Sequence, residues 1–235
     1  MGVLRREEIE RNFRQLKEDI KNICASLGAD CENIMIVAVT KTFPPEVVQS
    51  ALEAGITHIG ENRIQEAEDK VDTVRRLKGR FHMIGHLQSN KAKKAVEMFD
   101  MIQSVDSIKI AGKIADEAAK RSKRMEILLQ VNCSGEETKS GFDPLEMLEA
   151  AERIKALPGV EIKGIMTIGP FVDDESIIRR DFQLTRKLYD DIRSRNPDID
   201  MKYLSMGMSA DYHIALREGA NMIRVGSVIF GSRPA

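Results

Sequence analysis

The residue with the clearest chemical potential in this sequence is a lysine at the end of a predicted strand. Residues 34–39 are mostly aliphatic and β-branched, which is typical of a strand buried on both faces, and Lys41 follows that run after Thr40. In parallel α/β proteins, ligands bind at the carboxyl ends of the strands. Lys41 is therefore an ordinary surface cation, a salt-bridge partner, or an amine that desolvation keeps neutral so that it can form a Schiff base.

Other polar residues stand at the ends of further predicted strands. Each strand is a short apolar run, and the runs alternate with segments whose apolar residues recur every three or four positions. If the strands are parallel and form a barrel, their carboxyl ends make one rim, where polar side chains surround a single active-site region. The residues that this reasoning places on the rim are Lys41, Asn62, His86, Asn132, Thr167, Ser205 and Arg224.

The last two predicted strands also suggest a phosphate site. Ser209 stands where a helix is predicted to begin after the seventh strand, and Gly226 and Ser227 follow the eighth. Hydroxyls, backbone N–H groups and a helix N-terminus commonly bind phosphate in this region of barrels. The alternative is that Ser209 only caps its helix and Gly226 only permits a tight turn.

The elements that must position these residues repeat in a β–α pattern. An amphipathic helix from Ile9 to Leu27 comes first, with Gly28 placed to end it, and eight β–α units follow. We predict a closed (β/α)₈ TIM barrel of the α/β class with this extra N-terminal helix, in a single domain over residues 1–235. An open doubly wound sheet is the alternative, but no strand is followed by GxGxxG and no GxxxxGK[ST] occurs.

Three helix boundaries are predicted from local signals. Residues 64–77 are expected to form one continuous helix. Asp143, which precedes Pro144, is expected to be an N-cap, as is Ser209 in the short helix that ends at Gly219.

Composition narrows the classes of function. The 36 basic and 37 acidic residues nearly cancel, so no global field favours nucleic acid or an anionic membrane. No apolar run approaches the roughly 20 residues of a membrane-spanning helix, and the first residues lack a signal-peptide core. Cys24, Cys31 and Cys133 are scattered without CxxC spacing, so we expect a reducing, cytoplasmic compartment. The histidines lack HxxxH or HExxH spacing, and no metal site is expected.

Several stretches closely resemble the YggS/PROSC family of pyridoxal phosphate homeostasis proteins, which share the barrel of the alanine racemase N-terminal domain. The stretches occur in the same order at different strand ends and span nearly the whole chain. They are residues 37–41 (VAVTK), 60–62 (GEN), 82–91 (HMIGHLQSNK), 164–169 (GIMTIG), 205–209 (SMGMS) and 224–231 (RVGSVIFG).

The resemblance implies a cofactor and its binding residues. Lys41 would carry pyridoxal 5′-phosphate (PLP) as a Schiff base, and Arg224 would face the pyridine nitrogen. Arginine is a permanent cation without an acceptor, so it would keep that nitrogen unprotonated and make the ring a poor electron sink. Ser227 stands where the family more often has threonine, and it keeps the hydroxyl. The other cofactor-binding positions that the resemblance implies are Asn62, Ser205, Ser209 and Gly226.

Cofactor binding does not by itself imply turnover. Alanine racemases add a tyrosine from a second domain, whereas this sequence stops at Ala235, soon after the eighth predicted strand. Racemisation needs an acid/base group on each face of the cofactor, and the substitutes in this chain are Cys133, His86 and Tyr203. We therefore expect a protein that stores, buffers or delivers PLP with little or no turnover. A PLP-dependent racemase is the alternative.

The sequence leaves the roles of two more side chains open. Lys139, in a polar loop on the same rim, is either a second amine that relays the cofactor or a solvated lysine. Glu61 either orients the cofactor or only satisfies strand-end backbone groups. We expect transient contact with PLP-dependent apoenzymes and a monomeric state.

Overall fold

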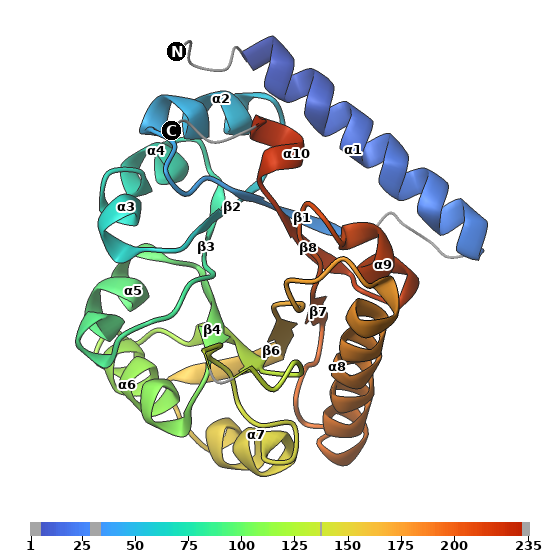
Figure 1. Cartoon of the computed structure of the whole chain (residues 1–235). Helices are drawn as coiled ribbons and strands as arrows, with labels where there is room; N and C mark the ends of the chain where they lie inside the picture. Colours follow the sequence, from blue (N-terminus) through green and yellow to red (C-terminus); the bar gives the residue numbers. More distant parts are fainter. Residues whose placement is uncertain (1–5, 29–33, 137, 232–235) are drawn as a thin grey trace.

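A closed barrel of parallel strands forms the centre of the molecule (Figure 1). The computed structural model describes residues 6–28, 34–136 and 138–231, and Cys31 lies outside them. Each strand pairs with the next along the chain, and the eighth pairs with the first. The predicted (β/α)₈ barrel is therefore confirmed. The strands are β1 (Met35–Val39), β2 (His58–Glu61), β3 (Arg80–Met83), β4 (Met101–Val105), β5 (Met125–Val131), β6 (Val160–Thr167), β7 (Tyr203–Ser205) and β8 (Met222–Val225).

Helices surround the barrel, as the ring in Figure 1 shows. They cover the outward faces of the strands. Each strand is therefore buried on both faces, which is why its sequence is a continuous apolar run. The helices are α1 (Arg6–Leu27), α2 (Pro45–Glu53), α3 (Ile64–Glu68), α4 (Val71–Arg76), the 3-10 turn η1 (Ser89–Lys91), α5 (Ala92–Met98), α6 (Ile108–Ala119), α7 (Met147–Lys155), α8 (Glu175–Arg195), α9 (Tyr212–Arg217) and α10 (Ser227–Phe230).

The N-terminal helix α1 is an addition to the barrel and lies along its outside, against α2, α9 and α10 (Figure 1). The side chain of Asn12 donates a hydrogen bond to the carbonyl of Ile229 in α10, at 2.9 Å. Helix α1 therefore ties the first described segment to the last. Its buried stripe consists of Ile9, Phe13, Leu16, Ile20 and Cys24.

Inside the barrel, apolar and polar side chains both contribute to the core. An apolar cluster inside the ring contains Val37, Met101, Leu128, Met166 and Met222. Barrel interiors are usually filled by branched aliphatic residues, and here buried polar residues share that space. These are His82, Gln103, Ser205 and Arg224.

The predictions for residues 64–77 and for Asp143 are wrong. The expected helix over residues 64–77 is two helices, α3 and α4, because Lys70 between them turns its amine inward to Glu61 and the carbonyl of Thr40. Asp143 does not cap α7, which begins at Met147. Its carboxylate instead accepts from the backbone N–H of Leu145, in a turn that precedes the helix.

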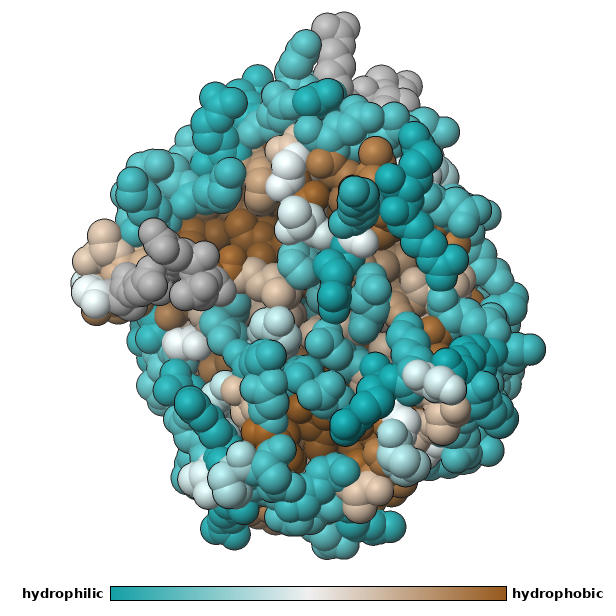
Figure 2. Space-filling model, turned by 180° about the vertical axis from the view of Figure 1, so that it is seen from behind, coloured by the Kyte–Doolittle hydropathy of each residue, from teal (hydrophilic) through white to brown (hydrophobic). Residues whose placement is uncertain are grey.

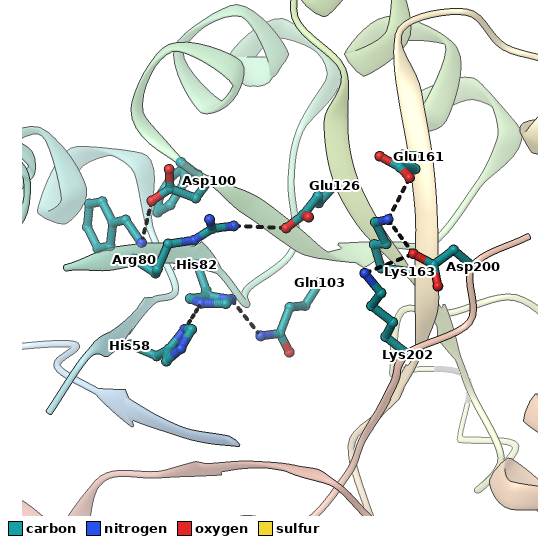
Figure 3. Close-up of polar contacts among 12 residues, drawn as sticks. His58, Arg80, His82, Asp100, Gln103, Glu126, Glu161, Lys163, Asp200 and Lys202 are labelled. Carbon is teal, nitrogen blue, oxygen red and sulfur yellow. Dashed lines mark hydrogen bonds and ion pairs between the residues drawn. The ribbon is translucent and has the colours of Figure 1, made fainter. Parts of the chain in front are cut away.

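Charged side chains close the amino ends of the strands (Figure 3). Arg80 pairs with Glu126 at 2.9 Å. Lys163, whose side chain is buried, pairs with Glu161 and Asp200. Seen from behind, the molecule is largely hydrophilic at the centre, with apolar patches around it (Figure 2).

The cysteines differ from one another. Cys133 is a free thiol, whereas Cys24 is disulfide-bonded. The argument from scattered cysteines to a reducing compartment did not anticipate this bond. Among the described residues, no helix is long and apolar enough to cross a membrane, and no group of three or more histidine, cysteine, aspartate or glutamate residues could hold a metal ion.

Candidate cofactor site

A cavity opens at the carboxyl ends of the strands and brings most of the predicted site together. Its volume is about 440 Å³, which is in the range of pockets that enclose a small ligand. Among the seven predicted cofactor-binding residues, only Ser205 does not line it. The lining residues are Val39, Lys41, Phe43, Asn62, Ile84, Ile168, Phe171, Met208, Ser209, Ala210, Arg224, Gly226, Ser227 and Gly231.

A tight turn after β1 presents Lys41 to this cavity. The backbone N–H of Phe43 donates to the carbonyl of Thr40 at 3.1 Å, so Lys41 and Thr42 are the central residues of the turn. Thr42 has a φ of 68°, a left-handed conformation that costs a β-branched residue energy. Its N–H donates to the carboxylate of Glu66 at 2.7 Å. Glu66 therefore helps to hold the strained turn that places Lys41 at the cavity.

Ser209 joins the loops after β7 and β8. Its hydroxyl accepts from the backbone N–H of Gly226 at 3.0 Å. The prediction that Ser209 caps a helix is wrong, because α9 begins after Asp211. The carboxylate of Asp211 accepts from the N–H of Met208 and so shapes the loop that carries Ser209.

The phosphate end of the predicted site has the required donors and little spare room. Ser227 begins α10, and Gly226 is the one residue between it and the end of β8. The first N–H groups of a helix have no acceptor within it, so those of α10 can donate to a ligand. A Cβ atom at Gly226 would lie 3.3 Å from the carbonyl oxygen of Val39, which is a tight contact. The hydroxyls of Ser209 and Ser227 and the nearby backbone donors suit a phosphate group.

Arg224 lies at the inner wall of the cavity and is 4% exposed. Its Nη2 donates to the carbonyl of Thr167 at 2.6 Å, and its Nη1 donates to the hydroxyl of Ser205 at 2.7 Å. Burial lowers the pKa of Arg224 to about 10, partly opposed by the charge of Asp211. Arg224 is still a cation at neutral pH. Ser205 is fully buried, and it reaches the site only through Arg224.

A buried ion pair lies beside the Lys41 turn. The amine of Lys70 donates to Glu61 at 2.6 Å and to the carbonyl of Thr40 at 2.8 Å, and the hydroxyl of Thr40 donates to the same carboxylate oxygen of Glu61. Burial raises the pKa of Glu61, and Lys70 opposes this rise. Glu61 does not line the cavity. This pair instead fixes the residue before Lys41 to β2 and to the start of α4.

The three acid/base candidates do not line the cavity. Burial raises the pKa of the Cys133 thiol to about 11, and its sulfur contacts the hydroxyl of Thr185 at 3.2 Å. His86 is exposed and pairs with Asp106 at 2.8 Å, beside a neighbouring hollow. Tyr203 begins β7, so it lies away from the carboxyl rim.

Two other predicted rim residues are also engaged elsewhere. The amine of Lys139 donates to Glu136 at 2.6 Å and to the carbonyl of Gly169 at 3.1 Å. The side-chain amide of Asn132 donates to backbone carbonyls of the same loop, at Glu136 and Lys139. Both therefore hold the loop that follows β5.

Sequence reasoning missed the apolar wall of the cavity. Phe43, Met208 and Phe171 line it, and Phe171 is 99% exposed at its mouth. Phe43 could have been found from its place two residues after Lys41. Phe171 lies in an irregular loop after β6, where apolar periodicity gives no signal.

Comparison with known proteins defines the class of this chain. The chain belongs to the family described as alanine racemase, N-terminal domain, whose model matches residues 5–234. An alanine racemase of Clostridium difficile 630 shares the fold with a TM-score of 0.72 at 18% identity, and the match covers 96% of this chain and 57% of that one. That likeness shows the fold alone.

More similar relatives narrow the description. A pyridoxal phosphate homeostasis protein of Pasteurella multocida is 35% identical over 227 residues, covering 96% of this chain and 97% of that protein. A crystal structure described as an unknown protein from Bifidobacterium adolescentis has a TM-score of 0.92 and 38% identity, and the match covers 98% of this chain and 97% of that one. PipY of Synechococcus elongatus PCC7942, solved with PLP bound, has a TM-score of 0.80 and 35% identity, with 90% and 100% covered. The resemblance to the homeostasis family is confirmed.

Proposed function

We propose that this chain binds PLP through Lys41 and acts in PLP homeostasis by storing, buffering or delivering the cofactor. The observation that carries the proposal is that one cavity brings together an amine, a buried cation and two hydroxyls, from Lys41, Arg224, Ser209 and Ser227. PLP has an aldehyde, a ring nitrogen and a phosphate that match these groups. The PLP-bound state of PipY, whose structure matches 90% of this chain, supports the same conclusion.

Each group in the cavity has a separate task in this proposal. When bound, PLP supplies an aldehyde carbon that an amine can attack and a ring that can withdraw electrons. Lys41 holds the aldehyde end, and Ser209, Gly226 and Ser227 hold the phosphate. Arg224 donates to the ring nitrogen and cannot accept a proton, so it weakens electron withdrawal. Asn62 bounds the ring.

We infer that turnover is small or absent. Proton transfer needs an acid/base group within hydrogen-bond reach of the proton that moves, whereas Cys133, His86 and Tyr203 lie outside the cavity lining. The relative from Pasteurella multocida, which is 35% identical, is named as a homeostasis protein and not as an enzyme. We further propose that the protein is a single barrel domain, that it is a monomer, and that it contacts PLP-dependent apoenzymes transiently.

Absorbance spectroscopy tests the covalent link. The purified protein mixed with PLP should develop a visible band that Lys41→Ala abolishes, and borohydride reduction followed by peptide mapping should place a pyridoxyl group on Lys41. Lys139→Ala is the matched control and should keep the band. A colourless wild type, or a reduced adduct on another lysine, would contradict the proposal. Assays for racemisation and transamination of amino acids should detect no turnover above that of free PLP.

A further inference from the structure

A chain of hydrogen bonds crosses the barrel interior from the cavity toward the amino end of β2. Arg224 Nη1 and the hydroxyl of Ser205 are 2.7 Å apart, and that hydroxyl is 2.7 Å from Gln103 Oε1. Gln103 Nε2 lies 3.1 Å from His82 Nδ1, and His82 Nε2 lies 2.8 Å from His58 Nδ1. Figure 3 shows the last two links. Five residues from β2, β3, β4, β7 and β8 are thus connected.

In the structure the chain runs from Arg224 toward His58. Arginine only donates, so the Ser205 oxygen accepts from it, and the Ser205 hydroxyl in turn donates to Gln103 Oε1. The Gln103 amide then presents N–H to His82 Nδ1. His82 must therefore carry its proton on Nε2 and donate it to His58 Nδ1. Both histidines are neutral in this arrangement.

Burial makes this arrangement costly unless every group is paired. Gln103 and Ser205 are fully buried and His82 is 1% exposed, and an unpaired polar group at such a depth is strongly unfavourable. Apolar side chains would fill the same volume without this demand, as they do elsewhere in the ring. The chain ends at the half-buried His58, at the amino end of β2.

We propose that Gln103, His82 and His58 are positioning residues for Arg224: they fix the orientation of its guanidinium in the cavity, and a proton added at His58 reverses the direction of the hydrogen bonds between His58 and Ser205. The part of this inference that concerns bound PLP rests on the proposed function. The part that concerns the direction of the chain does not.

The reversal follows from the donors and acceptors. A proton on His58 Nδ1 would donate to His82 Nε2, so His82 would then hold its own proton on Nδ1. Gln103 would turn its amide to accept that proton and would donate to Ser205. The Ser205 oxygen would accept from both Gln103 and Arg224, and its own proton would need a different acceptor. The hydrogen bonding around Arg224 would therefore change.

The surroundings of the two histidines favour the neutral state. Burial lowers the pKa of His58, and the charge of Arg80 on β3 lowers it further, while Asp100 before β4 opposes them. Lys17 of α1 lines the hollow that His58 borders. Burial, with His58 and Arg80, holds the pKa of His82 well below its ordinary value. The chain therefore keeps its direction at neutral pH and reverses only in acid.

Nitrogen-15 NMR of the histidine side chains tests the direction without cofactor. In the PLP-free wild type, His82 and His58 should both show the Nε2–H tautomer at pH 7.5. Gln103→Met, which removes the middle link, should shift the resonances of His82 and raise the fraction of His82 in the Nδ1–H tautomer. The matched control is Gln130→Met, because Gln130 is 4% exposed on the next strand and donates instead to the carbonyl of Ser140.

Bound PLP gives the second readout. Gln103→Met should weaken PLP binding about tenfold, as expected when a buried charged donor loses a partner's support, and it should move the pH midpoint of the bound cofactor's absorbance. Gln130→Met should change neither. An Nδ1–H tautomer at wild-type His82, or equal spectra and affinities for two folded variants, would overturn the proposal. If the wild type bound no PLP, the NMR result would still decide the direction and only the proposed function would fail.

Discussion

At the scale of single residues, burial decides which side chains can react. Lys41 is half-buried at the cavity, in a turn that Glu66 holds. Cys133 is close in sequence to the rim, yet burial raises the pKa of its thiol to about 11, and the hydrogen bond with Thr185 opposes this rise only in part. The two residues differ in environment more than in intrinsic chemistry. Of the two, Lys41 lines the cavity and Cys133 does not.

The Cys133 thiol should therefore be slow to react. Thiols react as thiolates, and a pKa of about 11 leaves on the order of a hundredfold less thiolate at pH 8 than an ordinary cysteine has. Ellman's reagent should modify Cys133 about a hundredfold more slowly in the native protein than in the unfolded chain. The matched control is Cys133→Ser, which should lose this slow phase. A rate equal to that of the unfolded chain would contradict the pKa.

The residues that the sequence could identify are those whose neighbours along the chain form a strand. Lys41 and Arg224 stand at or beside the ends of apolar runs, so periodicity alone places them on the rim. Ser205 could be assigned to the rim for the same reason, but its place beneath Arg224 depends on a contact between strands. The environments of Gln103 and Glu61 depend in the same way on partners that are distant in the sequence.

At the scale of elements, the pair of Glu61 and Lys70 joins three segments beside the site. Lys70 precedes α4, Glu61 ends β2, and both bond to Thr40 after β1. A buried ion pair contributes little net stability, but breaking one leaves an uncompensated charge. The second carboxylate oxygen of Glu61 is buried without a hydrogen-bond partner. The contact between the ends of β1 and β2 and the start of α4 should therefore be sensitive to the loss of Lys70.

Lys70→Met should destabilise the fold by about 3–5 kcal/mol at pH 7. Burial raises the pKa of Glu61, and removing Lys70 removes the main influence that lowers it. A raised carboxyl pKa means that the folded state binds the proton more tightly. The loss should thus be small below about pH 4.3, the ordinary value for glutamate, and should grow as pH rises above it. Urea unfolding at pH 4 and pH 7 measures both losses.

An exposed pair provides the control for this experiment. Lys94 and Glu68 form an ion pair whose side chains are 49% and 39% exposed, and such pairs contribute less than about 1 kcal/mol. Lys94→Met should therefore have little effect at either pH. If Lys70→Met lowered the free energy of unfolding equally at pH 4 and pH 7, the charge of Glu61 would not be the cause of the loss.

At the scale of the whole molecule, the added helix α1 supports the site from outside. It packs on α10 (Figure 1), whose first residue, Ser227, lines the cavity, and Asn12 bonds to the same short helix. Periodicity predicted α1 correctly, but it could not predict what α1 covers. That contact joins segments at opposite ends of the chain, and no local pattern carries it.

Two truncations in the core separate stability from support of the site. Leu16→Ala in α1 and Ile154→Ala in α7 both empty fully buried positions, so each should lower the free energy of unfolding by about 2–5 kcal/mol. Leu16→Ala should also weaken PLP binding severalfold, whereas Ile154→Ala should not, because α1 packs on α10 and the site lies beside that helix. Urea unfolding and PLP titration by absorbance measure the two effects. Equal PLP affinities in the two variants would show that α1 gives the site no support.

The contact between Asn12 and Ile229 also has a consequence for synthesis. These residues are separated by 217 positions, and the cavity takes its walls from residues as early as Val39 and as late as Gly231. A nascent chain still attached at β7 has the lysine but neither the arginine nor the phosphate end. The complete cavity can therefore form only after β8 has been synthesised and has paired with β1.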